Sequence, residues 1–360
     1  MALKRNTNAK RSRKFNLSMK NVRNVIWYPI PLALGIIYIS YQRFVKRGDK
    51  IETNEVLGYQ GSIFTNLEIS LIKMLPLRLL SRIWGIINSV YLPLWMREPI
   101  IGSYSRLFHC NVQEALVDDL KSYSNLGQFF RRDLKPGLRP IAKGNVVVSP
   151  ADGTVVHFGR VENELIEQVK GVTYSLPAFL GPQTWKKVDD AESYCQNLFS
   201  ENQKKTSLFH CVIYLAPGDY HKFHSPCEWR VNFRRHFPGK LLSVRPSFAS
   251  WFPRLFTINE RVAYVGEWMH GFFSLIAVGA TNVGSIKVYC DEDLRTNKMF
   301  NRRTAFIDRT FTENVALTKG DSFGEFNLGS TIVLVFEAPD NFTFNVKTGD
   351  RIKYGQLLSS

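Results

Sequence analysis

The sequence predicts an α+β protein in which helices come first and a mainly antiparallel β core follows. Before Arg131, apolar residues recur at helical spacing and are interrupted by prolines. From Asn145 onward, short runs rich in Val, Ile, Phe and Tyr are separated by Gly, Pro and Asp, which is typical of strands joined by turns. With 360 residues, 44% of them hydrophobic, the chain is long enough to bury such a core.

The net charge of +16 is concentrated at the N-terminus. Residues 1–50 hold twelve Lys or Arg against one acid, Asp49, and carry +11 of the total. The remaining +5 is too diffuse to define a duplex-binding face, so we expect no nucleic acid partner. The five cysteines are widely spaced and form no CxxC pair, which indicates neither a disulfide framework nor a zinc ribbon.

The N-terminus has the features of a targeting segment followed by a membrane anchor. Residues 1–23 are basic and free of acids, which suits a mitochondrial presequence better than a bacterial or secretory one. The uncharged residues 24–42 follow, and their apolar part, Val25 to Tyr41, would span about 25 Å as a helix. No small-residue cleavage site comes after it, so we expect a single transmembrane helix rather than a cleaved signal. The positive-inside rule then puts the large C-terminal part across the bilayer.

Residues 43–104 are expected to be a linker followed by amphipathic, membrane-associated helices. Between residues 64 and 101 the chain is apolar but is broken by prolines and basic residues. The apolar side of one such helix comprises Leu79, Leu80, Ile83, Trp84, Ile86 and Ile87. Its pattern suits a helix packed on a core and a helix in the membrane interface equally well. Residues 107–130 are expected to form a helix, a turn and a second helix.

The predicted strands follow from residue 145. They are NVVVS (145–149), TVVHFG (154–159), SLFHCVIYLA (207–216), RVAYVGEW (261–268), FFSLIAVGATNVGSIKVYC (272–290), TIVLVFEA (331–338) and FTFNV (342–346).

Three stretches combine reactive side chains with turn residues. In the first, SPADG, Asp152 precedes Gly153 between two predicted strands, where Asp is most often a turn residue. In the second, APGDYHKFHSP, His221 and His224 stand three residues apart, so both can face one cleft. They suit a structural pair or acid/base chemistry; a metal site is not favoured, because no third ligand stands at the required spacing.

In the third stretch, GEFNLGST, Ser330 follows Gly329 at the mouth of a strand. By itself this serine is most simply a turn hydroxyl. Together, the carboxylate, imidazole and hydroxyl of the three stretches supply the parts of a nucleophilic triad. An ordinary esterase would place its serine in GxSxG between a strand and a helix, and this serine precedes a strand instead.

At this point the motifs become recognisable as a set. They are FFRRDLKPGLRPI (129–141), SPADG (149–153), QVKGVTYSL (168–176), YLAPGDYHKFHSP (214–226), NERV (259–262), VGATNVGSI (278–286) and LGST (328–331). In this order they resemble the phosphatidylserine decarboxylases, most closely the membrane-anchored mitochondrial kind. The resemblance covers about residues 105–360, which we take as the decarboxylase domain; the leader and residues 183–205 match no motif.

The resemblance implies a chain that processes itself. Ser330 attacks the carbonyl of Gly329, His224 takes its proton, and Asp152 orients the imidazole, as in a charge relay. The products are a β chain ending at Gly329 and an α chain of residues 330–360, which form a heterodimer. The α chain begins with a pyruvoyl group derived from Ser330, the cofactor that receives the amine of phosphatidylserine and accepts electrons as carbon dioxide leaves. His221 is the candidate general acid in that reaction.

The resemblance also implies a location and partners. The protein is expected in the mitochondrial inner membrane as a single-pass protein, with its N-terminus in the matrix and its catalytic domain in the intermembrane space. Phosphatidylserine and the lipid bilayer are then its partners, and Arg78, Arg82 and Arg97 are candidates for attracting anionic headgroups. Two alternatives remain: a membrane-tethered Ser-His-Asp lipid hydrolase, and a lipid-binding module without catalysis.

Overall fold

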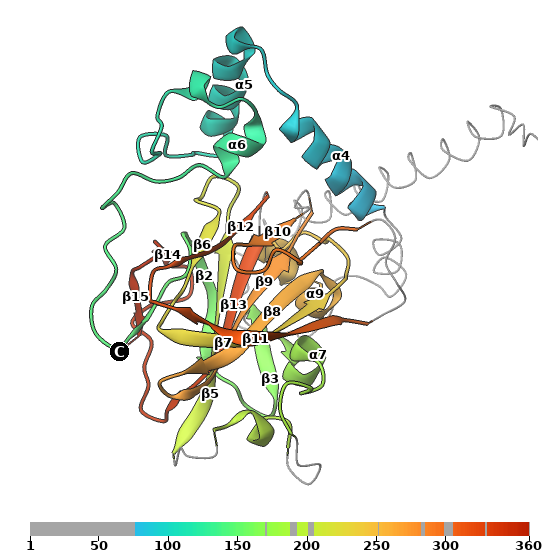
Figure 1. Cartoon of the computed structure of the whole chain (residues 1–360), viewed down its shortest axis with the longest axis vertical. Helices are drawn as coiled ribbons and strands as arrows, with labels where there is room; N and C mark the ends of the chain where they lie inside the picture. Colours follow the sequence, from blue (N-terminus) through green and yellow to red (C-terminus); the bar gives the residue numbers. More distant parts are fainter. Residues whose placement is uncertain are drawn as a thin grey trace, which may run out of the picture. The chain divides into compact units, whose positions relative to one another are not determined.

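The computed structural model describes residues 76–169, 171–187, 193–200, 205–250, 252–281, 285–298, 305–327 and 330–359 (Figure 1). The predicted targeting segment and anchor lie outside these residues, and so do Leu328 and Gly329. Among the residues that are described, no helix is both long and apolar enough to cross a membrane. The described chain is α+β with a mainly antiparallel sheet, which confirms that part of the predicted fold class.

An eight-stranded antiparallel sheet forms the core. Its strands stand in the order β11-β7-β8-β9-β13-β5-β2-β14. Their bounds are β2 (Gly153–Arg160), β5 (Thr206–Leu215), β7 (Trp229–Phe237), β8 (Arg261–Trp268), β9 (Gly271–Gly279), β11 (Ile307–Leu317), β13 (Ser330–Pro339) and β14 (Arg351–Ile352).

Three smaller sheets flank this core. One pairs β1 with β15, one has the order β10-β12-β6, and one pairs β3 with β4. Their bounds are β1 (Val147–Val148), β3 (Leu165–Val169), β4 (Val172–Ser175), β6 (Lys222–His224), β10 (Ile286–Val288), β12 (Ser322–Phe326) and β15 (Leu357–Ser359).

Both faces of the large sheet are buried at its central strands. Along β13, Ile332, Leu334 and Phe336 belong to one hydrophobic cluster, whereas Val333 and Val335 belong to a second one. Successive side chains of a strand point to opposite faces, so the two clusters lie on the two sides of the sheet. A strand that is buried on both faces reads as a continuous apolar run, which explains the sequence of β13.

Helices precede the strands, as predicted, and short helices occur between the strands. Their bounds are α4 (Leu77–Ser89), α5 (Leu94–Leu107), η1 (Leu120–Ser122), α6 (Leu126–Phe130), α7 (Leu176–Leu180), η2 (Gln196–Leu198), α8 (Pro246–Ala249) and α9 (Leu255–Ile258).

Two of the predicted elements are wrong. The first helix expected within residues 107–130 does not form. Helix α5 ends at Leu107, His109 has a left-handed backbone with φ of 54°, and Ala115 then forms a bridge with Leu134. The strand expected at residues 342–346 is a loop with a single β-bridge, between Phe344 and Ser359, and its phenylalanines pack against the core.

Helix α4 is amphipathic with its apolar side turned outward. Its buried residues are Ser81 and Asn88. From Leu79 to Ile87 its large apolar residues are exposed, from 38% for Trp84 to 65% for Ile86, whereas Leu77 at its start packs against the core. Arg78 attaches the helix to the sheet domain, because its Nε donates to the carbonyl of Gly239 at 2.8 Å. The sequence suited a helix packed on a core and a helix in the membrane interface equally well. The structure excludes the first for α4, because its apolar side does not face a core.

Candidate active site

The three reactive stretches meet at one edge of the large sheet. Strand β2 starts directly after Asp152, β5 ends directly before the loop that carries the histidines, and β13 starts at Ser330. These strands are antiparallel neighbours in the order β13-β5-β2, so those three ends lie side by side. Ser330 pairs with Leu215, and Thr154 pairs with Tyr214.

Backbone hydrogen bonds join the stretches directly. The N–H of His224 donates to the carbonyl of Pro150 at 2.7 Å, and the N–H of Phe326 donates to the carbonyl of His221 at 3.0 Å. The close approach requires a glycine at residue 153, because a Cβ there would lie 2.5 Å from the carbonyl oxygen of Tyr214. The histidines are thus tied on one side to SPADG and on the other to the strand that precedes Ser330.

Ser330 is a buried hydroxyl without a partner. Its side chain is fully buried, and its Oγ has no hydrogen-bond partner among the described residues. The same is true of the Oγ1 of Thr331. Leaving a buried hydroxyl unpaired costs about 1–3 kcal/mol. The arrangement fits a serine that is kept for chemistry rather than for stability, and it is compatible with conversion of this residue to a pyruvoyl group.

His221 is buried and neutral. Its Nδ1 lies 2.8 Å from the carbonyl oxygen of Asp219, which can only accept, so Nδ1 carries the proton. Its Nε2 has no partner among the described residues, and the ring lies 4.0 Å from that of Phe130. Burial lowers the pKa of His221 to about 3. In the uncleaved chain His221 is therefore a proton acceptor at Nε2, and it must first gain a proton to serve as the predicted general acid.

His224 is held from three sides. Its Nδ1 donates to the carbonyl of Gly320 at 3.0 Å, its Nε2 accepts from the hydroxyl of Tyr220 at 3.1 Å, and its ring stacks on Tyr354 at 3.9 Å. Burial lowers its pKa to about 4, so the imidazole is neutral at pH 7. A neutral imidazole with its Nδ1 proton held by a carbonyl is the form that a general base requires.

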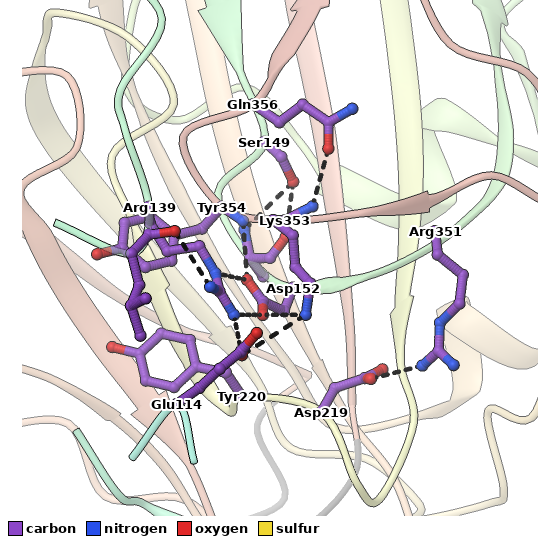
Figure 2. A network of polar contacts seen from close by, with 12 residues as sticks. Glu114, Arg139, Ser149, Asp152, Asp219, Tyr220, Arg351, Lys353, Tyr354 and Gln356 are labelled. Atoms are coloured by element: carbon purple, nitrogen blue, oxygen red, sulfur yellow. Dashed lines mark hydrogen bonds and ion pairs between the residues drawn. The ribbon is translucent and has the colours of Figure 1, made fainter. Parts of the chain in front are cut away.

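Asp152 is buried and belongs to an ionic network at the same edge (Figure 2). Its carboxylate accepts from Arg139 Nη2 at 2.7 Å, from Lys353 Nζ at 3.3 Å and from the N–H of Tyr354 at 2.9 Å. Glu114 is the second carboxylate of the network, 2.5 Å from Arg139. Two carboxylates and two cations leave the network close to neutral.

The structure differs here from the predicted charge relay. No hydrogen bond joins Asp152 to His224 in the described chain, because a backbone carbonyl already takes the Nδ1 proton of the imidazole. The two residues are linked through Tyr354, whose N–H contacts Asp152 and whose ring stacks on His224. The catalytic roles of both residues stay predictions.

Several residues around the site were not found from the sequence. Arg139 stood in a motif but had no assigned role, and Lys353 and Tyr354 lie near the C-terminus, where no motif was noted. Arg132 is also buried: its Nη2 donates to the carbonyl of Gly218 at 3.1 Å, while its Nε and Nη1 have no partner among the described residues. The motif FFRRDLKPGLRPI, which contains both Arg132 and Arg139, was the available signal.

The three arginines that were expected to attract headgroups have different surroundings. Arg97 is buried and donates to the carbonyls of Leu92 and Lys121, so that expectation is wrong for it. Arg78 is engaged with the sheet domain, and only Arg82 stays exposed. Among the residues described, no group of three or more His, Cys, Asp or Glu could hold a metal ion, and all five cysteines are free.

Three buried histidines make stability depend on pH. Burial lowers the pKa of His210 to about 3, of His221 to about 3 and of His224 to about 4, against an ordinary value near 6.5. Their contribution to the free energy of unfolding is complete above pH 6.5. It is lost as pH falls, because the unfolded chain binds protons at a higher pH than the folded chain and is thereby stabilised. We expect the free energy of unfolding to drop by roughly 1–2 kcal/mol per histidine between pH 7 and pH 5, as measured by urea denaturation. His210→Gln, away from the reactive edge, should reduce this slope; equal stability at both pH values would contradict the assignment.

The fold and the site together define a class of protein: an enzyme with a buried serine hydroxyl and two neutral imidazoles at one edge of an antiparallel sheet. The comparisons with known proteins identify its family. A family model described as phosphatidylserine decarboxylase matches residues 126–360. The chain belongs to this family.

Curated relatives cover most of the chain. Proteins named phosphatidylserine decarboxylase proenzyme, mitochondrial, from Pongo abelii and Caenorhabditis elegans are 48% and 45% identical to it. The first alignment covers 92% of this chain and 83% of the relative, and the second covers 82% and 74%. The corresponding Saccharomyces cerevisiae proenzyme 1 is 37% identical over 93% of this chain and 82% of its own length.

Proposed function

We propose that this chain is a proenzyme that cleaves itself between Gly329 and Ser330 and then decarboxylates phosphatidylserine to phosphatidylethanolamine with a pyruvoyl group derived from Ser330. Membership of the phosphatidylserine decarboxylase family supports the decarboxylation reaction. The observation that best supports self-cleavage is the buried, unpaired hydroxyl of Ser330 at the edge where the histidines gather.

Self-cleavage begins with the Oγ of Ser330. It attacks the carbonyl of Gly329, its neighbour in the chain, and the peptide nitrogen leaves to give an ester. Elimination across Cα and Cβ of Ser330 releases the β chain with a carboxylate, and hydrolysis of the remaining dehydroalanine releases ammonia. His224 takes the hydroxyl proton once its Nε2 exchanges the Tyr220 hydroxyl for Ser330. Asp152 acts as a positioning residue by holding Tyr354 against the imidazole.

The pyruvoyl group supplies an electron sink for the carbanion that forms as carbon dioxide leaves. The side chain of His221 is fully buried, and its Nε2 has no hydrogen-bond partner among the described residues. It can accept a proton at Nε2 and return it to the carbon that lost the carboxylate, which gives the general acid of the decarboxylation step.

The two chains should stay together after cleavage. The α chain would begin with β13, which lies inside the large sheet and pairs with β5 on one side and β9 on the other. Its remaining strands pair with the β chain as well, β14 with β2 and β15 with β1. Breaking one peptide bond directly before the first residue of β13 leaves these ladders intact, which supports a stable heterodimer.

The membrane is the natural location for this reaction. The outward apolar residues of α4 continue into the start of α5, where Trp95 is 77% exposed. An exposed apolar patch beside basic residues suits a membrane interface. With residues 1–23 as targeting segment, 24–42 as anchor, 43–104 as membrane-associated region and 105–360 as decarboxylase domain, we place the chain in the mitochondrial inner membrane, its N-terminus in the matrix and its catalytic domain in the intermembrane space. The names of the relatives support the mitochondrion.

We expect Ile87→Ser combined with Trp95→Ser to weaken binding to vesicles at least about tenfold, because each large side chain contributes roughly 1.5–3 kcal/mol when buried. Sedimentation with phosphatidylserine vesicles measures this binding. Ile307→Ser is the matched control, since Ile307 is an exposed apolar residue of β11, far along the chain. Equal weakening by the control, or none by the double variant, would count against the membrane surface.

Reductive trapping tests the reaction. The purified protein is incubated with phosphatidylserine and sodium cyanoborohydride. The masses of the denatured chains are then measured by mass spectrometry. A lipid adduct on the fragment of residues 330–360, together with release of phosphatidylethanolamine by the untreated protein, is the expected result. An uncut chain that is labelled by a serine-directed phosphonate would favour the hydrolase, and an uncut, unreactive chain would favour the lipid-binding module.

A further inference from the structure

A cavity lies beside the candidate active site. It has a volume of about 430 Å³ and is formed by residues of α4 and α6 and by residues next to β10 and β12. This volume falls in the range of small-ligand pockets. Nothing in the reaction described so far uses this cavity.

Two residues of the cavity wall stand near the candidate active site. Asn327 is in its wall and stands three residues before Ser330, so their Cα atoms are at most about 11 Å apart. Phe130 is in the wall as well, and its ring lies 4.0 Å from the ring of His221. A single aromatic ring therefore separates the cavity from the imidazole with the free Nε2.

The wall of the cavity is suited to a compact anion. Its charged side chains are the two arginines Arg82 and Arg131, and it contains no acidic residue. Eight further side chains are amides or hydroxyls, namely Ser81, Asn88, Ser89, Asn125, Ser285, Thr296, Asn297 and Asn327. A phosphodiester would find many hydrogen-bond donors in this wall.

Neither guanidinium is saturated in the described chain. Arg82 Nη1 donates to the carbonyl of Asn297 at 3.0 Å. Arg131 Nε donates to the carbonyl of Gly127 at 3.1 Å, and its Nη1 lies 3.8 Å from Glu325. Each guanidinium has five donors, so both keep N–H groups for a ligand.

The apolar side of α4 borders the same cavity. Ile86 is in the wall and is also 65% exposed. A lipid whose headgroup entered the cavity could therefore leave its acyl chains on the outward apolar side of α4.

We propose that Arg82 and Arg131 bind the phosphodiester of the substrate headgroup in this cavity and thereby direct the serine amine toward residue 330. The phosphorus and the amine nitrogen of phosphatidylserine are joined only through the Oγ, Cβ and Cα atoms of the serine, so a phosphate in the cavity keeps the amine near its wall. The inference rests on the proposed function, because it assigns the headgroup site of that reaction.

Direct binding tests the site without the chemistry. Dihexanoyl phosphatidylcholine, kept below its micelle concentration, carries the phosphodiester, but its quaternary amine cannot condense with a carbonyl. Calorimetry with the full chain should show that Arg82→Gln and Arg131→Gln each weaken binding about tenfold or more, the usual effect of losing a charge-assisted hydrogen bond. Dihexanoylglycerol, which lacks the phosphate, should bind equally to all variants.

The matched control is Arg106→Gln, an exposed arginine of α5 outside the cavity. It should leave the affinity unchanged. In assays with dihexanoyl phosphatidylserine, the two cavity variants should raise KM about tenfold, keep kcat within about twofold and still cleave themselves completely. Unchanged affinity in both cavity variants, or an equal loss in Arg106→Gln, overturns the inference. A wild-type protein that binds the choline lipid but neither cleaves itself nor decarboxylates overturns the proposed function instead.

Discussion

Ser330→Ala is expected to leave the chain uncut and without measurable decarboxylase activity. The alanine has no hydroxyl to attack Gly329, so neither the α chain nor its pyruvoyl group forms. The packing should survive, because the hydroxyl that is removed has no hydrogen-bond partner among the described residues. Intact mass measurement of the denatured wild-type protein should give a fragment of residues 330–360 that is lighter by one ammonia than the plain peptide, and this fragment should be absent from the variant.

Thr331→Val is the matched control for this experiment. Thr331 is the next residue, is equally buried and also has an unpaired hydroxyl. Valine has nearly the same shape and removes only the oxygen, so self-cleavage should continue. Cleavage in Ser330→Ala, or its loss in Thr331→Val alone, would show that Ser330 is not the nucleophile.

His221→Ala and His224→Ala should separate the two reactions. His224→Ala removes the base and should leave an uncut chain. His221→Ala should still cleave itself but lose decarboxylation by at least about a hundredfold, the usual contribution of a positioned acid or base. We expect different roles because the two Nε2 atoms have different surroundings. The Nε2 of His224 already accepts from the Tyr220 hydroxyl, whereas the Nε2 of His221 has no partner among the described residues and is free for a bound substrate.

Each histidine variant serves as the control of the other, because both imidazoles are buried, neutral and three residues apart. Gel electrophoresis reports cleavage, and release of phosphatidylethanolamine reports decarboxylation. Loss of both reactions in His221→Ala, with normal folding by circular dichroism, would contradict the division of roles.

The site could be approached from the sequence because its chemistry is local. SPADG, the paired histidines and the LGST motif each join a reactive side chain to turn residues within a few positions. Their proximity in space follows from the order of the strands in the sheet, and local sequence patterns do not predict that order. Ser330 lies beside Leu215 because β13 inserts between β9 and β5, although the two residues are far apart in the chain.

The orientation of the side chains was harder to predict from the sequence. A triad pattern predicts a carboxylate next to an imidazole, but Asp152 is surrounded by Arg139, Lys353 and Tyr354 instead. Two of these three come from the last ten residues of the chain. Such long-range contacts depend on how β14 and its neighbours pack, and no local pattern encodes them.

By itself, the sequence determined the α+β class, most strands of the core, the candidate reactive residues and the family, because periodicity and motif chemistry are properties of short segments. Only the tertiary structure decided which way α4 faces, that the helix expected after Leu107 does not form, and that a cavity adjoins the candidate active site. An amphipathic helix has the same pattern whether its apolar side meets a protein core or points outward. The choice is made by the surface it packs against, which here contacts Ser81 and Asn88 and leaves the apolar side free for a membrane.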